Sequence, residues 1–518
     1  MTWRSSEDVE NKLPSPMPLP AWERARVRAA PLFSSPIFEG EGPSSCGIGA
    51  VAPGSRAPAV FRGVSLLDEG PGEMVEGAPT SWGWKARSTT FDNTSTARIS
   101  VADMKVVVTS FGSAGDFNPL LAIAGALVRR GVDVTFVANP FYEARVRTTG
   151  SRFVGAGSFF DVFAALEGNP RYIQSRAGVL SIWKELAVPS IREIYPAVLA
   201  TVRDAGATAV VSHVISYGGA WAATKSGVRS VIVTTTPSAW FSRHEPTVFG
   251  NWRAPRVAQG WLTWALRVVG GLVARRPLAH LAADLGAPPV ADIVHDADLN
   301  LGVWPEWFRR RAPDDPPRSH TCGFVFEHDE PSQPLRHDLV EFLAAGAPPV
   351  VAGFGSAASL HAAQRYRAVA EACGHLGQRC LLIGASADAV APSAEVMAVD
   401  AAPYARVFPA ASAIVHHGGF GTCAEALRAG KPSLVTPFAF DQFDTAARVA
   451  DRGAGRWLRG DPTDAGAVAA ALGSMLRDPS AAIGARQAAA EIASGPDGAE
   501  RAAELIESTL YPQWVTIP

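Results

Sequence analysis

A glycine-rich turn with two histidines carries the strongest chemical pattern in the sequence. The turn reads Val415-His416-His417-Gly418-Gly419-Phe420-Gly421-Thr422-Cys423-Ala424-Glu425, between an apolar run and a helical one. Backbone N–H groups at a helix start bind anions, and the helix dipole adds to the attraction. His417 and Thr422 can donate hydrogen bonds to phosphate, and Glu425 lies one helical turn further, within reach of a ribose diol. The turn therefore predicts a nucleoside diphosphate site, although an isolated turn of this kind could also be structural.

Two further segments extend this site. Asp441 and Gln442 follow the next apolar run and offer acceptors and donors for several sugar hydroxyls. A second turn, Gly353-Phe354-Gly355-Ser356, could also face the diphosphate. Adjacent histidines can bind metal, but no third histidine or carboxylate is spaced nearby, so we expect no metal.

A candidate general base lies in the segment Gly112-Ser113-Ala114-Gly115-Asp116, after the first apolar run. Asn118 and Pro119 suit the cap and first position of a helix, which would leave Asp116 in the preceding loop. A carboxylate there can accept a proton from an attacking hydroxyl. The alternative is that Asp116 only caps the helix. A dinucleotide fingerprint is incomplete, because only Gly112 and Gly115 are present and no acidic residue follows the second strand.

Alternating strands and helices must position these groups. The expected strands are Lys105–Thr109, Asp133–Ala138, Ala209–Ser212, Ser230–Thr234, Pro349–Phe354, Arg379–Ile383, Ala413–His416 and Ser433–Thr436. The expected helices include Pro119–Arg130, Gln364–Leu376, Thr422–Ala429, Asp444–Asp451 and about Ala499–Thr509. This alternation predicts α/β architecture with two doubly wound, Rossmann-like domains of parallel strands. Ligands of such domains bind at the carboxyl ends of the strands, where the motifs lie.

Two boundaries divide the chain. A proline- and charge-rich segment, Pro305 to Pro334, separates an N-terminal domain, 104–325, from a C-terminal domain, 326–518. Residues 1–103 are rich in Pro, Gly and Ser, lack a sustained period, and are expected to be a disordered extension. Because Met104 directly precedes the first strand, we hypothesise that it is the true start. Peptides from upstream of Met104 in the native protein would disprove this.

Composition narrows the class of protein. The 518 residues are 47% hydrophobic with a formal net charge of −2, which gives no reason to expect a nucleic acid partner. Five scattered cysteines favour neither a disulfide framework nor a zinc site, and indicate a reducing compartment. No apolar signal segment is visible near Met1, so we expect a cytoplasmic protein.

Apolar and aromatic side chains in the first domain leave several interpretations. The stretch Val257 to Ala274 is interrupted by Arg267, which disfavours a membrane span. It could be a buried or acceptor-lining helix, or a helix resting on a membrane surface. Aromatic candidates for an acceptor pocket, which could equally be core residues, are Trp183, Trp221, Trp240, Phe241, Trp261 and Trp264.

The spacing His417…Thr422…Glu425…Asp441-Gln442 resembles the donor signature of family 1 nucleotide-sugar glycosyltransferases, which have the GT-B fold. The resemblance covers Met104 to about Leu510 and implies that His417 and Thr422 contact diphosphate, Glu425 ribose, and Asp441-Gln442 the sugar. Ala402-Pro403-Tyr404 resembles the segment where the nucleobase stacks, without the Trp of plant members. The Gly112–Asp116 segment resembles bacterial and sterol enzymes, where Asp replaces the catalytic His of plant members. Overall the motifs look most like those of the bacterial rhamnosyltransferase of rhamnolipid synthesis.

This resemblance implies an inverting, metal-independent transfer of a hexose, of glucose or rhamnose type. The donor would be a UDP- or dTDP-sugar, a co-substrate with no separate cofactor. The acceptor would be the hydroxyl of a small, apolar molecule, either a lipid or a secondary metabolite, held in the N-terminal domain beside Gly112, Ser113 and Gly115. The family's last helix crosses back to the first domain, and peripheral contact with the inner face of a membrane is a further expectation. Alternatives are a nucleotide-sugar 2-epimerase and a non-catalytic binding partner of another transferase.

Overall fold

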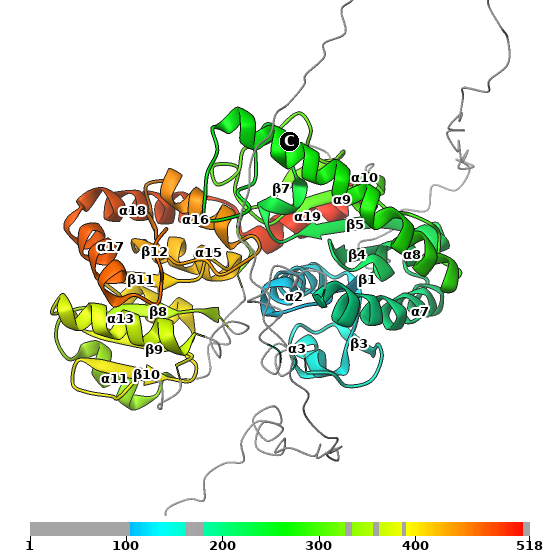
Figure 1. The fold of residues 1–518 in the computed structure, drawn as a ribbon. Coiled ribbons are helices and arrows are strands. Elements are labelled where there is room, and N and C mark those ends of the chain that lie inside the picture. Colours follow the sequence, from blue (N-terminus) through cyan, green and yellow to red (C-terminus); the bar gives the residue numbers. More distant parts are fainter. Residues whose placement is uncertain are drawn as a thin grey trace, which may run out of the picture. The chain divides into compact units, whose positions relative to one another are not determined.

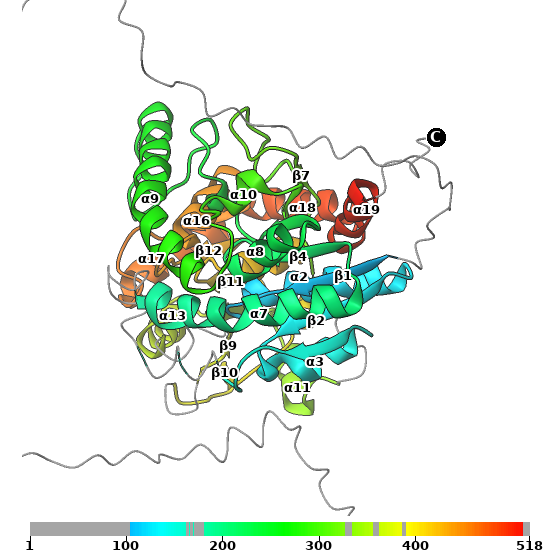
Figure 2. The same cartoon turned by 90° about the vertical axis from the view of Figure 1, so that its right-hand side faces the viewer.

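The computed structural model describes residues 104–161, 165, 169, 181–326, 334–355, 362–385 and 390–510 (Figure 1). The expected disorder of residues 1–103 and the predicted donor residue Ser356 lie outside the described residues. Two parallel sheets, each with helices on both faces, make up the described chain (Figure 2). The predicted α/β fold with two Rossmann-like domains is therefore confirmed.

The first sheet has seven strands in the order β3-β2-β1-β4-β5-β6-β7. They are β1 (Lys105–Thr109), β2 (Asp133–Ala138), β3 (Arg152–Gly155), β4 (Ala209–His213), β5 (Arg229–Thr234), β6 (Leu299–Gly302) and β7 (Ser319–Thr321). β1 lies between β2 and β4, with Thr109 opposite both Val137 and Ser212. The apolar strands Val106 to Val108 and Val231 to Val233 are buried, as expected of a parallel sheet covered on both faces.

The second sheet has six strands in the order β10-β9-β8-β11-β12-β13. They are β8 (Val350–Gly353), β9 (Cys380–Ile383), β10 (Val396–Val399), β11 (Ala413–His416), β12 (Ser433–Val435) and β13 (Gly455–Trp457). All neighbouring pairs are parallel, so all the strands end at one edge of the sheet.

Helices cover both sheets. Those of the first half are α2 (Ala114–Arg129), η2 (Pro140–Tyr142), α3 (Glu143–Thr148), η3 (Trp183–Ala187), α7 (Val188–Ala205), α8 (Tyr217–Ser226), η4 (Pro237–Trp240), α9 (Arg256–Asp284) and α10 (Ile293–Asp296). Those of the second half are α11 (His337–Ala344), α13 (Ala363–His375), α14 (Tyr404–Val407), η6 (Phe408–Ala410), α15 (Phe420–Arg428), α16 (Gln442–Asp451), α17 (Ala465–Arg477), α18 (Pro479–Ser494) and α19 (Gly498–Leu510).

One sequence expectation about these elements was wrong, and one strand was not predicted. The first helix begins at Ala114 rather than Pro119, because Ser113 caps it and its backbone carbonyl accepts from the N–H groups of Asp116 and Phe117. The segment from Pro305 to Pro334 is more than a linker, because it contains β7 of the first sheet. Its period-2 pattern was too short to be recognised.

Aromatic side chains and the last helix join the two halves. Trp304, Phe308 and Phe324, which follow strands of the first sheet, pack edge to face or tilted against Phe420 of α15. α19 returns to the first half and packs along α2, burying residues such as Ile506 in its core (Figure 1). Ion pairs between Arg129 and Glu500 and between Arg130 and Glu507 flank this contact; each guanidinium is within 2.8 Å of its partner carboxylate.

A buried carboxylate on α16 also ties the halves together. Asp444, whose side chain is 3% exposed, accepts from the backbone N–H of Val248 at 3.0 Å and from Nε of Arg448 at 2.7 Å. Arg448 is itself only 11% exposed and lies 3.7 Å from Glu245 of the first half. Asp444 thus accepts hydrogen bonds from two buried donors, and water could not take its place if the carboxylate were removed.

The apolar stretch Val257 to Ala274 lies in α9, and the interpretation of it as a buried helix was wrong. By length and composition this helix could cross a membrane. Only 17% of its most apolar 18-residue stretch is buried in the protein. Its outward side carries exposed tryptophans, valines and leucines. An exposed apolar helix of this size requires its own explanation.

We predict that Asp444→Ala lowers the free energy of unfolding by about 3–5 kcal/mol, because it leaves the Arg448 guanidinium buried and unpaired and the Val248 N–H unsatisfied. Glu143→Ala is the matched control, since the Glu143–Arg147 pair is 44% and 62% exposed and should contribute at most about 1 kcal/mol. Urea unfolding of both variants provides the measurement. Equal losses would contradict the role assigned to Asp444.

Candidate active site

The predicted donor segments start from adjacent strands. In the second sheet His416, the last residue of β11, is paired with Gly353 of β8 and with Val435 of β12. The turns that follow these three strands therefore leave the same edge of the sheet side by side. This arrangement brings together the 353–355 turn, the two-histidine turn and the loop leading to Asp441.

The two-histidine turn depends on glycines that allow very close packing. Gly418 has φ +91°, and a Cβ there would lie 2.9 Å from the carbonyl oxygen of Gln442. Cβ atoms at Gly419 and Gly355 would lie 2.3 Å and 2.8 Å from the His417 ring. The imidazole is therefore held between two glycines, and α15 begins directly after Gly419, its N-cap.

Both histidines of the turn are kept neutral. Burial lowers the pKa of His416 to about 3, and its Nδ1 accepts from the N–H of Gly418 at 3.1 Å, which fixes the turn. Burial, and secondarily the positive charge of Arg365, lowers the pKa of His417 to about 4. The Nδ1 atom of His417 is buried without a hydrogen-bond partner. A neutral imidazole retains one N–H, so His417 can serve as a donor without carrying charge.

Tyr404, which the family resemblance places at the nucleobase, lies close to the glycine-rich turns at Gly355 and Thr422. Its ring stacks on Phe408, with centroids 4.4 Å apart, and its hydroxyl is close to the backbone of Gly355 and the side chain of Thr422. Burial raises its pKa to about 12, so the hydroxyl remains a neutral donor. One face of this ring is occupied within the protein, while Pro403 before it is exposed. The Tyr404 hydroxyl therefore lies between the turn at Gly355 and the start of α15 at Thr422.

Two other predicted donor residues have partners within the protein. Glu425 pairs with Arg428 at 2.6 Å, and that guanidinium lies over the ring of Phe326. The side chain of Phe420 belongs to the aromatic cluster between the halves, so only its backbone N–H remains for a ligand. Gly421, at the start of the same helix, is exposed.

Asp441 and Gln442 begin α16 beside this turn. The Gln442 side-chain oxygen accepts from the backbone N–H groups of Phe438 and Ala439, at 2.7 Å and 3.1 Å, which leaves its NH₂ group as the outward donor. Asp441 hydrogen-bonds the side chain of Thr236, from the first half of the chain. The proposed sugar-binding pair therefore lies where both halves meet.

Asp116 stands in the first turn of α2 rather than in a loop. Its Oδ2 accepts from the N–H of Ser113 at 2.9 Å and from the Ser113 hydroxyl at 3.0 Å, so the capping role considered as an alternative is present. Gly112 is required at the preceding turn, because its φ is +125° and a Cβ would meet Asp116 Oδ2 at 2.4 Å. Tyr142 donates to the Gly112 carbonyl at 2.7 Å, and Gly115 is the second residue of the helix that Ser113 caps. Capping therefore occupies Oδ2 of Asp116 and leaves Oδ1 outside the cap.

The other oxygen of Asp116 faces a histidine that sequence reasoning missed. His213, the last residue of β4, lies with Nε2 3.7 Å from Asp116 Oδ1 and 2.9 Å from the Thr235 hydroxyl. It is 2% exposed, its Nδ1 has no hydrogen-bond partner, and burial lowers its pKa. The sequence signal that could have identified His213 is its position at the end of a strand of the first sheet, where ligands of such domains bind.

Asp116 and Asp441 come from different sheets and are near enough to interact. Burial first, and then the negative charge of Asp116, raise the pKa of Asp441 to about 7. The candidate base and the proposed sugar site thus share one electrostatic environment. A carboxylate with a perturbed pKa beyond the ends of parallel strands, such as Asp441, is typical of a functional site.

Arg365 of α13 is a second residue that sequence reasoning missed. Its guanidinium stacks 3.4 Å above the ring of Phe438, donates to the Thr436 carbonyl at 2.8 Å, and has its pKa lowered to about 10 by burial. Phe438 in turn lies against His417. Arg365 therefore places positive charge beside the two-histidine turn, where an anion would compensate its burial.

The aromatic candidates for the acceptor pocket divide into core and surface residues. Trp221 and Trp240 are buried and donate to Val290 and Thr234, so they are core side chains and do not line a pocket. Trp261 and Trp264 lie on the exposed side of α9.

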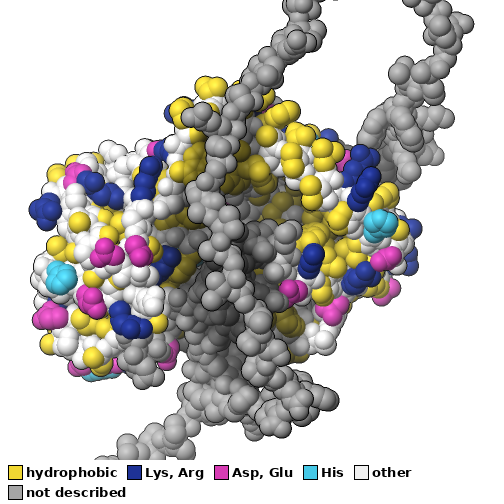
Figure 3. Space-filling view, in the orientation of Figure 1, with side chains coloured by type: hydrophobic (Ala, Val, Ile, Leu, Met, Phe, Trp, Pro, Cys, Tyr) yellow, Lys and Arg dark blue, Asp and Glu magenta, His cyan; other side chains and the backbone are white. Residues whose placement is uncertain are grey.

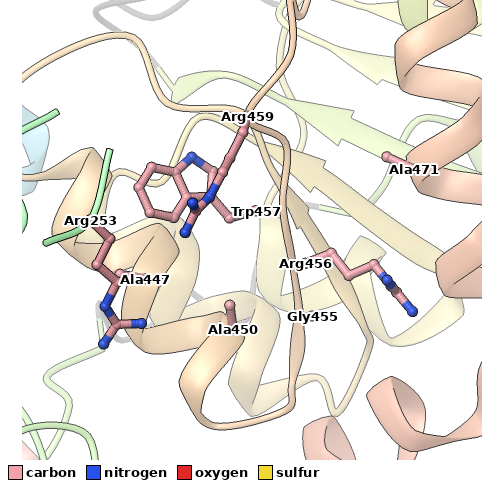
Figure 4. A pocket seen from close by; sticks show the side chains of 8 residues that line it. All are labelled: Arg253, Ala447, Ala450, Gly455, Arg456, Trp457, Arg459 and Ala471. Atoms are coloured by element: carbon pink, nitrogen blue, oxygen red, sulfur yellow. The ribbon is translucent and has the colours of Figure 1, made fainter. Parts of the chain in front are cut away.

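A cavity of about 310 Å³ lies away from these groups. It is lined by Arg253, Ala447, Ala450, Gly455, Arg456, Trp457, Arg459 and Ala471 (Figure 4). Arg253 is paired with Asp451, Arg456 with Asp478, and Arg459 lies over Trp457. None of the predicted site residues lines it. The described residues contain no cluster of three or more His, Cys, Asp or Glu that could hold a metal ion.

Comparison with known proteins identifies the family to which a chain with this fold and these turns belongs. Residues 384–508 match the family model of the erythromycin biosynthesis protein CIII-like C-terminal domain. Over 386 residues the chain is 30% identical to glycosyltransferase GtfC of Amycolatopsis orientalis, covering 72% of this chain and 90% of that protein. The chain belongs to the family 1 GT-B glycosyltransferases. It is a glycosyltransferase of nucleotide-sugar type.

Other relatives in this glycosyltransferase family differ in their acceptors. A sterol 3-beta-glucosyltransferase of Arabidopsis thaliana is 27% identical over 426 residues, covering 76% of this chain and 67% of that protein. The spinosyn rhamnosyltransferase SpnG, solved with thymidine diphosphate, shares the fold with a TM-score of 0.54 at 20% identity, covering 78% of this chain and all of that one.

The raised pKa of Asp441 predicts a pH-dependent stability. An Asp with its usual pKa of 3.8 in the unfolded chain and about 7 in the folded protein costs folding free energy increasingly as pH rises between these values. Asp441→Asn should therefore stabilise the protein by about 1–2 kcal/mol at pH 8, after allowance for partial exposure, and hardly at pH 4. Asp116→Asn should give a smaller stabilisation of the same kind, because it removes the negative charge that helps to raise the pKa of Asp441.

Thermal unfolding across this pH range is the measurement for Asp441. Asp338→Asn is the control, because its pairing with Arg336 lowers the pKa of Asp338, and neutralising it should give no gain at high pH. A stability difference for Asp441→Asn that is the same at every pH would contradict the assignment.

Proposed function

We propose that this glycosyltransferase moves a hexose of glucose or rhamnose type from a UDP- or dTDP-sugar to a hydroxyl of a small, apolar acceptor. The reaction inverts the anomeric carbon and uses no metal. The proposal is supported above all by one observation: Asp116, in the first turn of the helix that follows β1, is close enough to Asp441 of the second half for its charge to raise the pKa of Asp441. A base for the acceptor and a ligand for the sugar thereby share one electrostatic environment. Thymidine diphosphate bound to SpnG, and the sterol relative, are consistent with the proposed donor and acceptor classes.

In this proposal the second half binds the donor. The diphosphate lies against the N-terminus of α15, receiving hydrogen bonds from its backbone N–H groups and from Thr422 and Tyr404. His417 donates from its neutral ring, and Arg365 supplies the nearest positive charge. Asp441 and the Gln442 amide hold sugar hydroxyls. As the bond from the anomeric carbon to diphosphate breaks, negative charge grows where these donors already point.

The first half supplies the acceptor and its base. The acceptor oxygen attacks the anomeric carbon from the side opposite the diphosphate, and its proton passes to Asp116 Oδ1. Ser113 holds the other oxygen of that carboxylate, so the base is oriented before the acceptor binds. Neutral His213, beside Oδ1, can accept a hydrogen bond or relay the proton onward. The products are the glycoside and a nucleoside diphosphate.

The alternatives predict different products. A 2-epimerase would need no acceptor and would release an epimerised sugar nucleotide. A non-catalytic partner would bind nucleoside diphosphate and show no turnover with any acceptor. Asp116 beside an ordered donor signature favours transfer over both. We further propose a cytoplasmic protein, since that compartment supplies activated sugar nucleotides.

We predict that Asp116→Asn lowers turnover by about 10²–10⁴-fold, the usual contribution of a general base, with the donor dissociation constant unchanged. The amide still accepts the Ser113 hydrogen bond, so the helix start should survive. Initial rates of glycoside formation measure the effect, with Glu143→Gln as the control on the same half of the chain. Unchanged turnover in Asp116→Asn would remove this residue from the role of base.

Metal independence and inversion form a separate prediction. Excess EDTA should leave the initial rate within about twofold, because organic donors rather than a Lewis acid stabilise the leaving diphosphate. An α-linked donor should yield a β-linked product in the proton NMR spectrum. Loss of activity with EDTA that a divalent cation restores, or a retained anomeric configuration, would contradict this mechanism.

A further inference from the structure

The longest helix, α9, presents a broad apolar side to solvent. Eight of the fifteen large hydrophobic side chains that are exposed among the described residues lie on it: Val257, Trp261, Trp264, Leu266, Val268, Val269, Leu272 and Val273. Positions 257, 261, 264, 268 and 272 follow helical spacing and form one stripe. Leu272 and Val273 are 65% and 67% exposed. Hydrophobic side chains gather in the region of this helix in the space-filling view (Figure 3).

The other side of α9 is attached to the protein near both ends of the helix. Gln259 and Thr263 hydrogen-bond the segment at Thr247 near one end, and Leu278 and Leu281 enter the core near the other. The helix, about 43 Å long at 1.5 Å per residue, is therefore fixed lengthwise on its domain. Because one side stays bound to protein, the helix can lie on an apolar surface but cannot pass through it.

Basic side chains accompany the exposed apolar stripe. Arg275 and Arg276 follow it directly, are exposed, and have no ion-pair partner among the described residues. The one acidic residue of α9, Asp284, is already paired with Arg192. Tryptophans, aliphatic side chains and unneutralised arginines on one exposed helix match an interface with anionic lipid, where apolar groups enter and arginines meet headgroups.

We propose that the exposed side of α9 docks this protein on an anionic membrane surface. The uncompensated Arg275 and Arg276 favour a membrane over a second copy of the chain, because Asp284, the one acidic residue of α9, is already paired with Arg192 and the same helix of a second copy would offer no unpaired carboxylate. The membrane would cover the Trp and Leu side chains that water now contacts.

The first turns of the docking helix contact a segment that leads to the active site. Arg243, which precedes α9, stacks 4.6 Å above Trp261, and the segment leading to it contains Thr236, the partner of Asp441. An acceptor dissolved in the membrane would therefore leave the lipid beside the site that uses it. This last step rests on the proposed function, whereas docking itself does not.

Co-sedimentation of the full chain with lipid vesicles tests the proposal. Vesicles of phosphatidylcholine with phosphatidylglycerol should bind the protein, and pure phosphatidylcholine should bind it less. Trp264→Glu combined with Leu272→Glu should reduce the partition coefficient at least tenfold, equivalent to about 1.4 kcal/mol. Val340→Glu combined with Ile483→Glu is the matched control, because each side chain is 46% exposed and lies on other helices. Arg275→Glu with Arg276→Glu should remove the preference for anionic vesicles.

Three results would overturn the proposal: no binding of the full chain to either vesicle, equal binding of the Trp264/Leu272 and control variants, or a dimer in light scattering that only the Trp264/Leu272 variant dissociates. Thermal stabilisation by thymidine or uridine diphosphate is measured in the same variants. Since these positions are outside the donor site, stabilisation should persist when docking is lost. Loss of docking alone would leave the proposed transferase function intact, and loss of nucleotide binding alone would leave docking intact.

Discussion

Two carboxylates from different sheets, Asp116 and Asp441, must be held close together, and most of the described fold contributes to this. Each lies after a strand of its own sheet, so their separation depends on how firmly the halves are joined. The aromatic cluster around Phe420, the return of α19 onto α2, and the buried carboxylate of Asp444 provide three such joints. Burial first, and then the negative charge of Asp116, raise the pKa of Asp441, so the two carboxylates act on each other electrostatically.

The donor half achieves its chemistry with buried neutral groups beside one cation. Glycines allow the His417 ring to fit between two backbone segments, and the burial that follows removes its charge. Arg365 then supplies the local positive charge; it is stacked on Phe438, has no ion pair among the described residues, and feels the negative charge of Asp461 only as a minor effect beside its burial. Such a site is incomplete without an anion, because a buried guanidinium is costly until it is paired. A diphosphate is the anion that the geometry suits.

Long apolar strands and the glycine-rich turns were predictable from sequence, because local composition determines both. The central strand β1 and the strand ending at His416 were predicted with their observed bounds. Short edge strands such as β7 were not, since three residues carry no measurable period. The roles of His213 and Arg365 depend on neighbours more than twenty and seventy residues away, Thr235 and Thr436. The exposure of α9 likewise could not be predicted, because the sequence of an apolar helix does not show whether the rest of the protein covers it.

Binding of nucleoside diphosphate is the most direct test of the central claim that the second sheet forms a donor site facing Asp116. Thermal unfolding would be followed with uridine, thymidine and guanosine diphosphates, with Thr422→Val and His417→Leu as comparisons. A ligand present at about 100 times its dissociation constant should stabilise the protein by about 2.7 kcal/mol, and both substitutions should reduce that gain. Absence of stabilisation by every diphosphate in a folded protein would contradict the donor site, and with it the proposed transfer.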